Sequence, residues 1–114
     1  MTYSEILQLI IRRLGDNYIS TNSEVLEDLL KEKIALASNI SNREITLYQD
    51  NIEIEDKNLS ILSPEIIEAT IIGYQERGVE YTRSQSEVGQ SNSFIDVDEN
   101  LRNNIIKNGK RVIY

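Results

Sequence analysis

Apolar side chains recur at three- and four-residue spacing from Tyr3 to Leu14, which is the spacing of one face of an α-helix. Thr2 or Ser4 can cap the start of this helix, because a short polar side chain accepts a hydrogen bond from a free backbone N–H. Gly15 can end it, since glycine adopts the left-handed conformation that closes many helices. The pattern predicts a first amphipathic helix.

A second apolar stripe runs from Leu26 to Ile40, in a helix that we expect to begin near residues 21–23. Polar N-cap candidates and an acidic first turn precede it, which suits the positive end of a helix dipole. Lys33 interrupts the stripe, and we expect its ammonium group to reach solvent along the aliphatic stem. Ser and Asn residues at 39–42 compete for backbone hydrogen bonds and should end the helix there.

Residues 44–62 permit two interpretations. Ile45, Leu47, Ile52 and Ile54 alternate with polar residues, which resembles a small hairpin turning at residues 49–51. An irregular acidic loop fits equally well, because two isolated strands are marginal unless they pack on a helix.

Ser63-Pro64-Glu65 has the form of a helix start, with an N-cap, a proline and an acidic first turn. The residues that follow are apolar on nearly every side, so we expect this helix in the middle of a bundle, with Tyr74 in the core. Gly78 is the predicted end of the helix.

Residues 80–93 contain one aliphatic side chain, Val88, so we expect a flexible loop. Beyond it, Asp98 can cap a short helix that carries Leu101, Ile105 and Ile106, and residues 111–114 could form a terminal strand. The prediction is therefore a mainly α single domain spanning 1–114: a small bundle of three to four helices, with a helical core at 1–79, the loop at 80–93, and a short helix with a C-terminal arm at 94–114. A short hairpin and the terminal strand are optional additions.

The 114 residues carry a formal net charge of −7 and include no Cys and no His. Within one chain this composition excludes a Ser-His-Asp triad, a cysteine nucleophile, a disulfide and any His/Cys zinc site. The charge is uneven, because residues 44–56 hold five acids and no base, whereas residues 100–114 hold four bases and no acid. We expect no membrane segment and no secretory signal, since no long apolar run is present.

Two patterns of carboxylates resemble functional sites. Asp96, Asp98 and Asn100 match the first ligand spacings of a calcium-binding loop, but Leu101 and Lys107 occupy the positions that need Gly and Glu. Glu53 and Glu55 would share one face of a strand, yet no apolar pocket accompanies them, so we interpret them as a solvated acidic loop. No cofactor, metal site or catalytic residue is predicted.

Nearly the whole sequence, and most clearly residues 63–102, resembles a known family. The apolar helix ends in Tyr74-Gln75-Glu76-Arg77-Gly78-Val79-Glu80, and a Ser-rich stretch then closes on Phe94 before the last short helix. This arrangement resembles the head–tail connector proteins of long-tailed bacteriophages, also called neck adaptors or head-completion proteins. Their third helix typically ends in Tyr-x-x-Arg-Gly-x-Glu and continues into a Ser/Gly loop. Tyr81 departs from the small residue expected there.

The resemblance implies a non-enzymatic virion protein, made in the bacterial host cytoplasm, that forms a ring beneath the portal. Its expected partners are the portal protein, the next neck (stopper) protein and other copies of itself, in a ring that follows the portal's twelve-fold symmetry. Genomic DNA would pass through without sequence-specific binding. Tyrosines and charges beside the loop, the acidic stretch and the basic end are the candidate interface residues: Tyr81, Arg83, Glu53, Glu55, Arg102, Lys107, Lys110, Arg111 and Tyr114.

Two other functions remain open. One is a different neck or tail-completion protein with the same structural role. The other is a small helical regulator or antitoxin-like binding module, against which the acidic net charge argues, because it repels DNA at long range.

Overall fold

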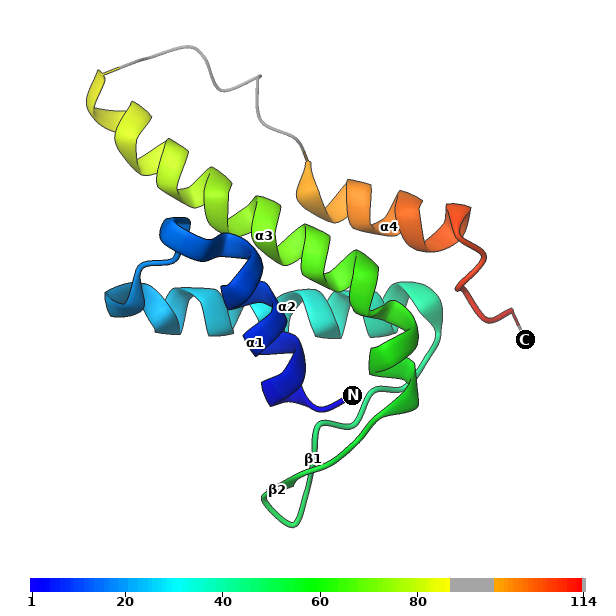
Figure 1. Ribbon diagram of the computed structural model, residues 1–114. Helices are drawn as coiled ribbons and strands as arrows, with labels where there is room; N and C mark the ends of the chain where they lie inside the picture. Colours follow the sequence, from blue (N-terminus) through cyan, green and yellow to red (C-terminus); the bar gives the residue numbers. More distant parts are fainter. Residues whose placement is uncertain (87–95, 114) are drawn as a thin grey trace.

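The computed structural model describes residues 1–86 and 96–113, including their side chains except those of Asn22 and residues 77–86. Four helices pack as a small bundle: α1 (Tyr3–Leu14), α2 (Ser23–Ser41), α3 (Lys57–Ser86) and α4 (Val97–Lys107). A hairpin of β1 (Tyr48–Gln49) and β2 (Ile52–Glu53) projects from one end of the bundle (Figure 1). The predicted mainly α fold is confirmed.

Helix α3 is the central element, as the apolar pattern predicted, and packs against α1, α2 and α4. It contributes Leu62, Ile66 and Ile67 to the core, whereas Ile71 is half-buried. Tyr74 is buried, as expected, and its hydroxyl accepts a hydrogen bond from the backbone N–H of Ile19 at 3.2 Å. All four helices contribute to one continuous apolar core.

The start of α3 differs from the prediction. The helix begins at Lys57, after Asp56, whose Oδ1 accepts from the Leu59 N–H at 2.8 Å in the manner of an N-cap. Pro64 therefore lies inside the helix, where its missing N–H leaves the carbonyl of Ser60 without its usual donor. The hydroxyl of Ser63 donates to that carbonyl at 2.9 Å. Ser63 thus replaces the hydrogen bond that proline removes, rather than capping a new helix.

The end of α3 also differs. The helix continues past Gly78 to Ser86, so the predicted terminator and the first part of the predicted flexible loop, residues 80–86, are helical. One glycine inside a helix costs only about 1 kcal/mol relative to alanine, which a long helix tolerates. The rest of that loop, residues 87–93, lies outside the described residues.

The ends of α1 and α2 agree with the sequence pattern. Thr2 caps α1 in a reciprocal capping box with Glu5, and Gly15 follows the helix at a φ of 54°. α2 ends at Ser41, and Asn42 adopts a φ of 58°. Polar residues with access to left-handed conformations therefore end α2 where the pattern placed its end.

The hairpin interpretation of residues 44–62 is correct for its central part. Tyr48 pairs with Glu53 and Gln49 with Ile52 in antiparallel register. Asp50 and Asn51 both have positive φ, 53° and 64°, which matches the two-residue turn whose twist suits adjacent strands.

The C-terminal segment departs from expectation in two places. Asp96, not Asp98, caps α4 by accepting from the Glu99 N–H at 3.1 Å. Residues 111–113 form no strand, and Tyr114 lies outside the described residues; the backbone hydrogen bond of 111–113 runs from the Val112 N–H to the Ser41 carbonyl at 2.7 Å. A single bond at the end of a helix offers no ladder to extend.

Candidate interaction surfaces

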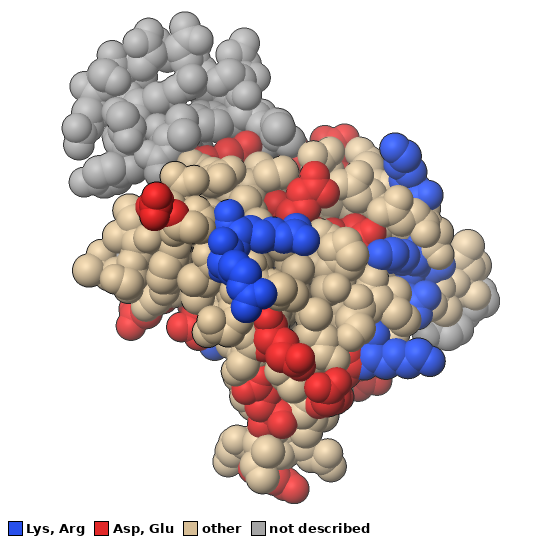
Figure 2. Space-filling model, viewed as in Figure 1, with Lys and Arg blue, Asp and Glu red and all other residues tan. Residues whose placement is uncertain are grey.

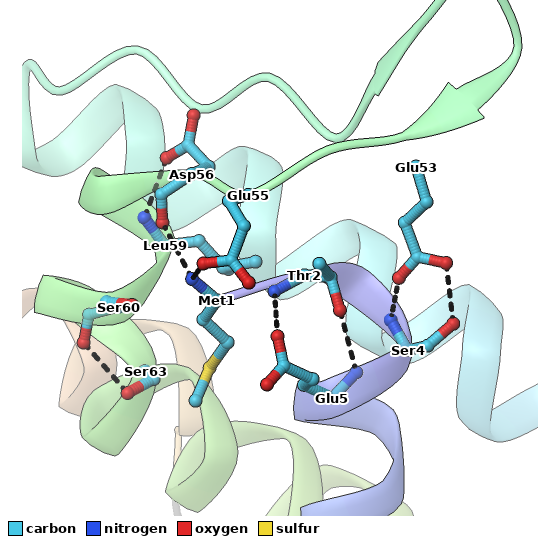
Figure 3. A network of polar contacts seen from close by, with 10 residues as sticks. All are labelled: Met1, Thr2, Ser4, Glu5, Glu53, Glu55, Asp56, Leu59, Ser60 and Ser63. Carbon is cyan, nitrogen blue, oxygen red and sulfur yellow. Dashed lines mark hydrogen bonds and ion pairs between the residues drawn. The ribbon is translucent and has the colours of Figure 1, made fainter.

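The hairpin is bound to the start of α1 by carboxylates (Figure 3). Glu53 accepts from both the backbone N–H and the hydroxyl of Ser4, the latter at 2.7 Å. Glu55 forms an ion pair with the amine of Met1 at 2.9 Å. The two glutamates stay in contact with solvent, as a solvated acidic stretch implies, because Glu55 is 75% exposed and Glu53 is half-exposed, but both carboxylates are also bound to residues 1–4.

Where the hairpin meets the start of α1, two carboxylates, those of Glu53 and Glu5, have a lowered pKa. The hydroxyl of Ser4, followed by its backbone N–H, lowers the pKa of Glu53 because both donate to the charged form. The backbone N–H of Thr2 and then its hydroxyl lower the pKa of Glu5 in the same way. Both carboxylates are therefore held in the charged state by structural hydrogen bonds, which is not how a general acid is prepared.

Asp56 connects the hairpin to the bundle. Its Oδ1 caps α3, and its Oδ2 accepts from the backbone N–H of Thr46 at 2.9 Å. Its own N–H donates to the carbonyl of Met1 at 3.0 Å. One side chain thus fixes the two arms of the hairpin and the start of α3 relative to one another.

A buried lysine attaches α4 to α2. The side chain of Lys33 is only 6% exposed, and its ammonium lies 2.6 Å from Oδ1 of Asp98 and 3.3 Å from Oε1 of Glu32. The predicted route to solvent is wrong, because α4 covers the position and supplies Asp98 as a partner. Asp98, taken from the sequence as a cap, is instead the counter-ion of a buried charge.

A buried glutamate attaches the C-terminal arm to α3. The side chain of Glu65 is 3% exposed; it accepts from the ammonium of Lys110 at 2.9 Å and from the amide of Asn108 at 2.6 Å. Lys110 also donates to the carbonyl of Ile61 at 2.8 Å. Lys110 is therefore an internal anchor and does not belong to an available basic surface.

The remaining predicted interface residues separate into two groups. Arg102, Lys107 and Arg111 are exposed on α4 and the arm, as an interaction surface requires. Tyr114 and the side chains of Tyr81 and Arg83 lie outside the described residues. Sequence reasoning missed Arg43, whose Nε donates to the carbonyl of Lys110 at 2.7 Å, and no local pattern signals that contact.

The described residues offer little for small-molecule chemistry. A depression between α3 and α4, lined in part by Glu68, Asn100 and Asn104, has a volume of about 10 Å³, room for one water molecule. Among the side chains that the structure describes, no group of three acidic residues is placed to hold a metal ion. None of the described helices is long and apolar enough to cross a bilayer.

Comparison with known proteins gives no assignment. No protein-family model, no curated protein and no solved structure matches the chain significantly.

Proposed function

We propose that this protein is a structural subunit of the neck of a long-tailed bacteriophage, assembled as a ring beneath the portal, where it joins head to tail and extends the DNA channel. The observation that carries the proposal is the arrangement around α3. An apolar helix containing Pro64 and the Tyr74–Glu80 motif occupies the centre of the bundle. A Ser-rich segment leads from it to a short helix that packs back on α2 and α3. This order of elements is the one on which the family resemblance rests.

The charged groups support a structural role. The charges that the bundle buries, Lys33 and Glu65, each have a partner from the C-terminal segment. Glu53 of the hairpin is hydrogen-bonded to Ser4 of α1, and Glu55 forms an ion pair with the amine of Met1. An acidic net charge of −7 is compatible with a conduit for DNA, because like charge lets a duplex pass without gripping its phosphates.

Virion composition tests the proposal. In particles of the phage whose genome encodes this chain, we expect the protein in the same copy number as the portal protein, and an amber mutation in its gene should yield DNA-filled heads without tails. A pull-down with portal protein and with tail components separates the connector from another neck position. Absence from purified virions would contradict the proposal, as would sequence-specific binding of duplex DNA, which a regulator would show.

A further inference from the structure

Asn108 and Gly109 are the one Asn-Gly pair of the sequence, and they lie where α4 ends and the C-terminal arm begins. An asparagine followed by glycine is prone to lose its side-chain amide, because glycine has no side chain to hinder attack by its own backbone nitrogen. Here that amide is a structural contact: it donates to Oε2 of Glu65 at 2.6 Å, and the side chain of Glu65 is 3% exposed. Loss of the amide therefore changes the surroundings of a buried charge.

The closed turn holds the pair in a conformation that cannot react. Asn108 has a ψ of 4°, which turns the Gly109 nitrogen away from the Asn108 side chain, so the five-membered ring of a succinimide cannot close. The Gly109 N–H is also engaged, since it donates to the carbonyl of Ile106 at 3.0 Å. Both residues of the pair are exposed, so the turn can open locally while the apolar core stays intact.

We propose that Asn108 is a site of spontaneous deamidation that turns a reversible opening of the arm into a permanent release. In the open turn the deprotonated Gly109 nitrogen attacks Cγ of Asn108; a C–N bond forms, and the bond from Cγ to the amide nitrogen breaks. The amide nitrogen takes a proton from water and leaves as ammonia. Water then opens the succinimide at either carbonyl, which gives aspartate or isoaspartate at position 108.

Neither product can dock as the amide does. A carboxylate at position 108 faces Glu65 where the amide now donates, and Lys110, 2.9 Å from Oε1 of Glu65, would have to neutralise both carboxylates. Like charges repel most strongly where water is excluded, as at Glu65. Isoaspartate also lengthens the backbone by one carbon, which displaces the hydrogen bond from the Lys110 N–H to the carbonyl of Ile105. Both products therefore favour the released arm.

Exposed bases near the turn do not offset this repulsion. Figure 2 shows basic side chains on the side of the molecule where α4 and the arm lie. Lys107 and Arg111, which flank the turn in the sequence, are exposed, and water screens their charges. Only the chain and water take part in the reaction, so the modification does not depend on the proposed function.

Peptide mapping by mass spectrometry, after incubation in warm and mildly alkaline buffer, tests the reaction. In protein unfolded by urea, Asn108 should be the asparagine that reacts fastest, giving both aspartate and isoaspartate. In the folded protein Asn108 should react at least about tenfold more slowly, because the reactive conformation exists only in the open turn. Lys110→Met removes a contact that holds the arm and should bring the folded-state rate closer to the unfolded one.

Asn108→Asp reproduces one product and tests the release, with folding verified by circular dichroism. The Val112 amide, which donates to the Ser41 carbonyl at 2.7 Å, should exchange hydrogen at least about tenfold faster in this variant than in wild type. Adding Glu65→Gln should restore its protection by removing the opposing charge. Asn108→Ser, which removes the amide without adding a charge, should keep most of the protection. Asn103→Asp, the same change at an exposed position of α4, is the matched control and should exchange like wild type.

Four results would overturn the inference. The first two are equal reaction rates at Asn108 in folded and unfolded protein, and an Asn108 that stays intact in Lys110→Met while the unfolded chain reacts. The third is wild-type protection of Val112 in Asn108→Asp. The fourth is an equal loss of protection in Asn108→Ser, which would assign the release to the lost hydrogen bond and not to the new charge.

Discussion

The hairpin corner and the C-terminal segment are both attached to the bundle through charged groups, but the two attachments differ in burial. At the hairpin, Glu53 and Glu55 hold the start of α1 from exposed or half-exposed positions, Glu55 with 75% of its side chain in water. At the C-terminal segment, Lys33 and Glu65 are almost fully buried. An exposed pair contributes little because water competes for both partners, whereas removing one partner of a buried charge leaves the other without solvation. An ion pair or charged hydrogen bond should therefore contribute much more to the free energy of unfolding at the C-terminal segment than at the hairpin.

The largest effect is expected at Glu65. Lys110→Met leaves the buried carboxylate with Asn108 as its remaining partner and should lower the free energy of unfolding by about 3 kcal/mol in urea titrations. Adding Glu65→Leu should restore most of that loss, because an apolar pair replaces an uncompensated charge. Lys107→Met, which removes an equal but exposed charge, should change stability by less than about 0.5 kcal/mol. Equal losses in the single and double variants would show that burial of Glu65 is unimportant.

An asymmetric effect is expected at the Lys33–Asp98 pair. Asp98→Ala leaves a buried ammonium with only Glu32 at 3.3 Å and should cost about 2 kcal/mol. Lys33→Met leaves an aspartate that is 54% exposed and already hydrated, so the cost should stay below about 1 kcal/mol. Glu99→Ala is the control for Asp98→Ala, because it removes an acid from the same first turn of α4. If Lys33→Met lowered the stability more than Asp98→Ala, the unpaired buried ammonium would not be the cause of the destabilisation.

The smallest effect is expected at the hairpin and should appear mainly as pH dependence. Because the pKa of Glu53 is lower in the folded protein than its ordinary 4.5, its stabilising effect is complete above that pH. The effect should disappear as the pH falls through the folded-state pKa, since the unfolded chain then takes up the proton more readily. Glu53→Gln should make the loss of stability in acid less steep, because the variant already lacks the carboxylate's contribution at pH 7 and differs least from wild type in acid. Asp50→Asn, which removes an exposed acid from the turn of the same hairpin, is the control, and a similar change in both variants would contradict the role given to Glu53.

The sequence predicts the helices better than it predicts their attachments. Periodicity located α1, α2 and the central position of α3, because burial of an apolar stripe depends on residues close together in the chain. The predicted start and end of α3 are wrong, because both signals lie inside the helix. The hydroxyl of Ser63 compensates for the missing N–H of Pro64, and Gly78 is tolerated within the helix. Local patterns could not show what covers a residue from a distant segment.

The environment of the candidate interface residues depends most on partners that are distant in the sequence. The sequence predicts that the ammonium of Lys33 reaches solvent from within the apolar stripe, because a local pattern does not show Asp98, sixty-five positions away. Lys110 looked like part of a basic tail for the same reason, since Glu65 is forty-five positions away. Arg102, Lys107 and Arg111 are exposed, as expected of charged positions outside the apolar stripe of α4, and their role in an interface stays a prediction.

Native-state hydrogen exchange tests the comparison most directly. If buried charges attach the C-terminal segment more firmly than exposed ones attach the hairpin, the amides of Leu101 and Ile105 should exchange only through global unfolding, and those of Ile54 and Thr46 through smaller local openings. In Lys110→Met the protection of the α4 amides should fall toward that of the hairpin. Faster exchange of α4 than of the hairpin in the wild-type protein would contradict the account.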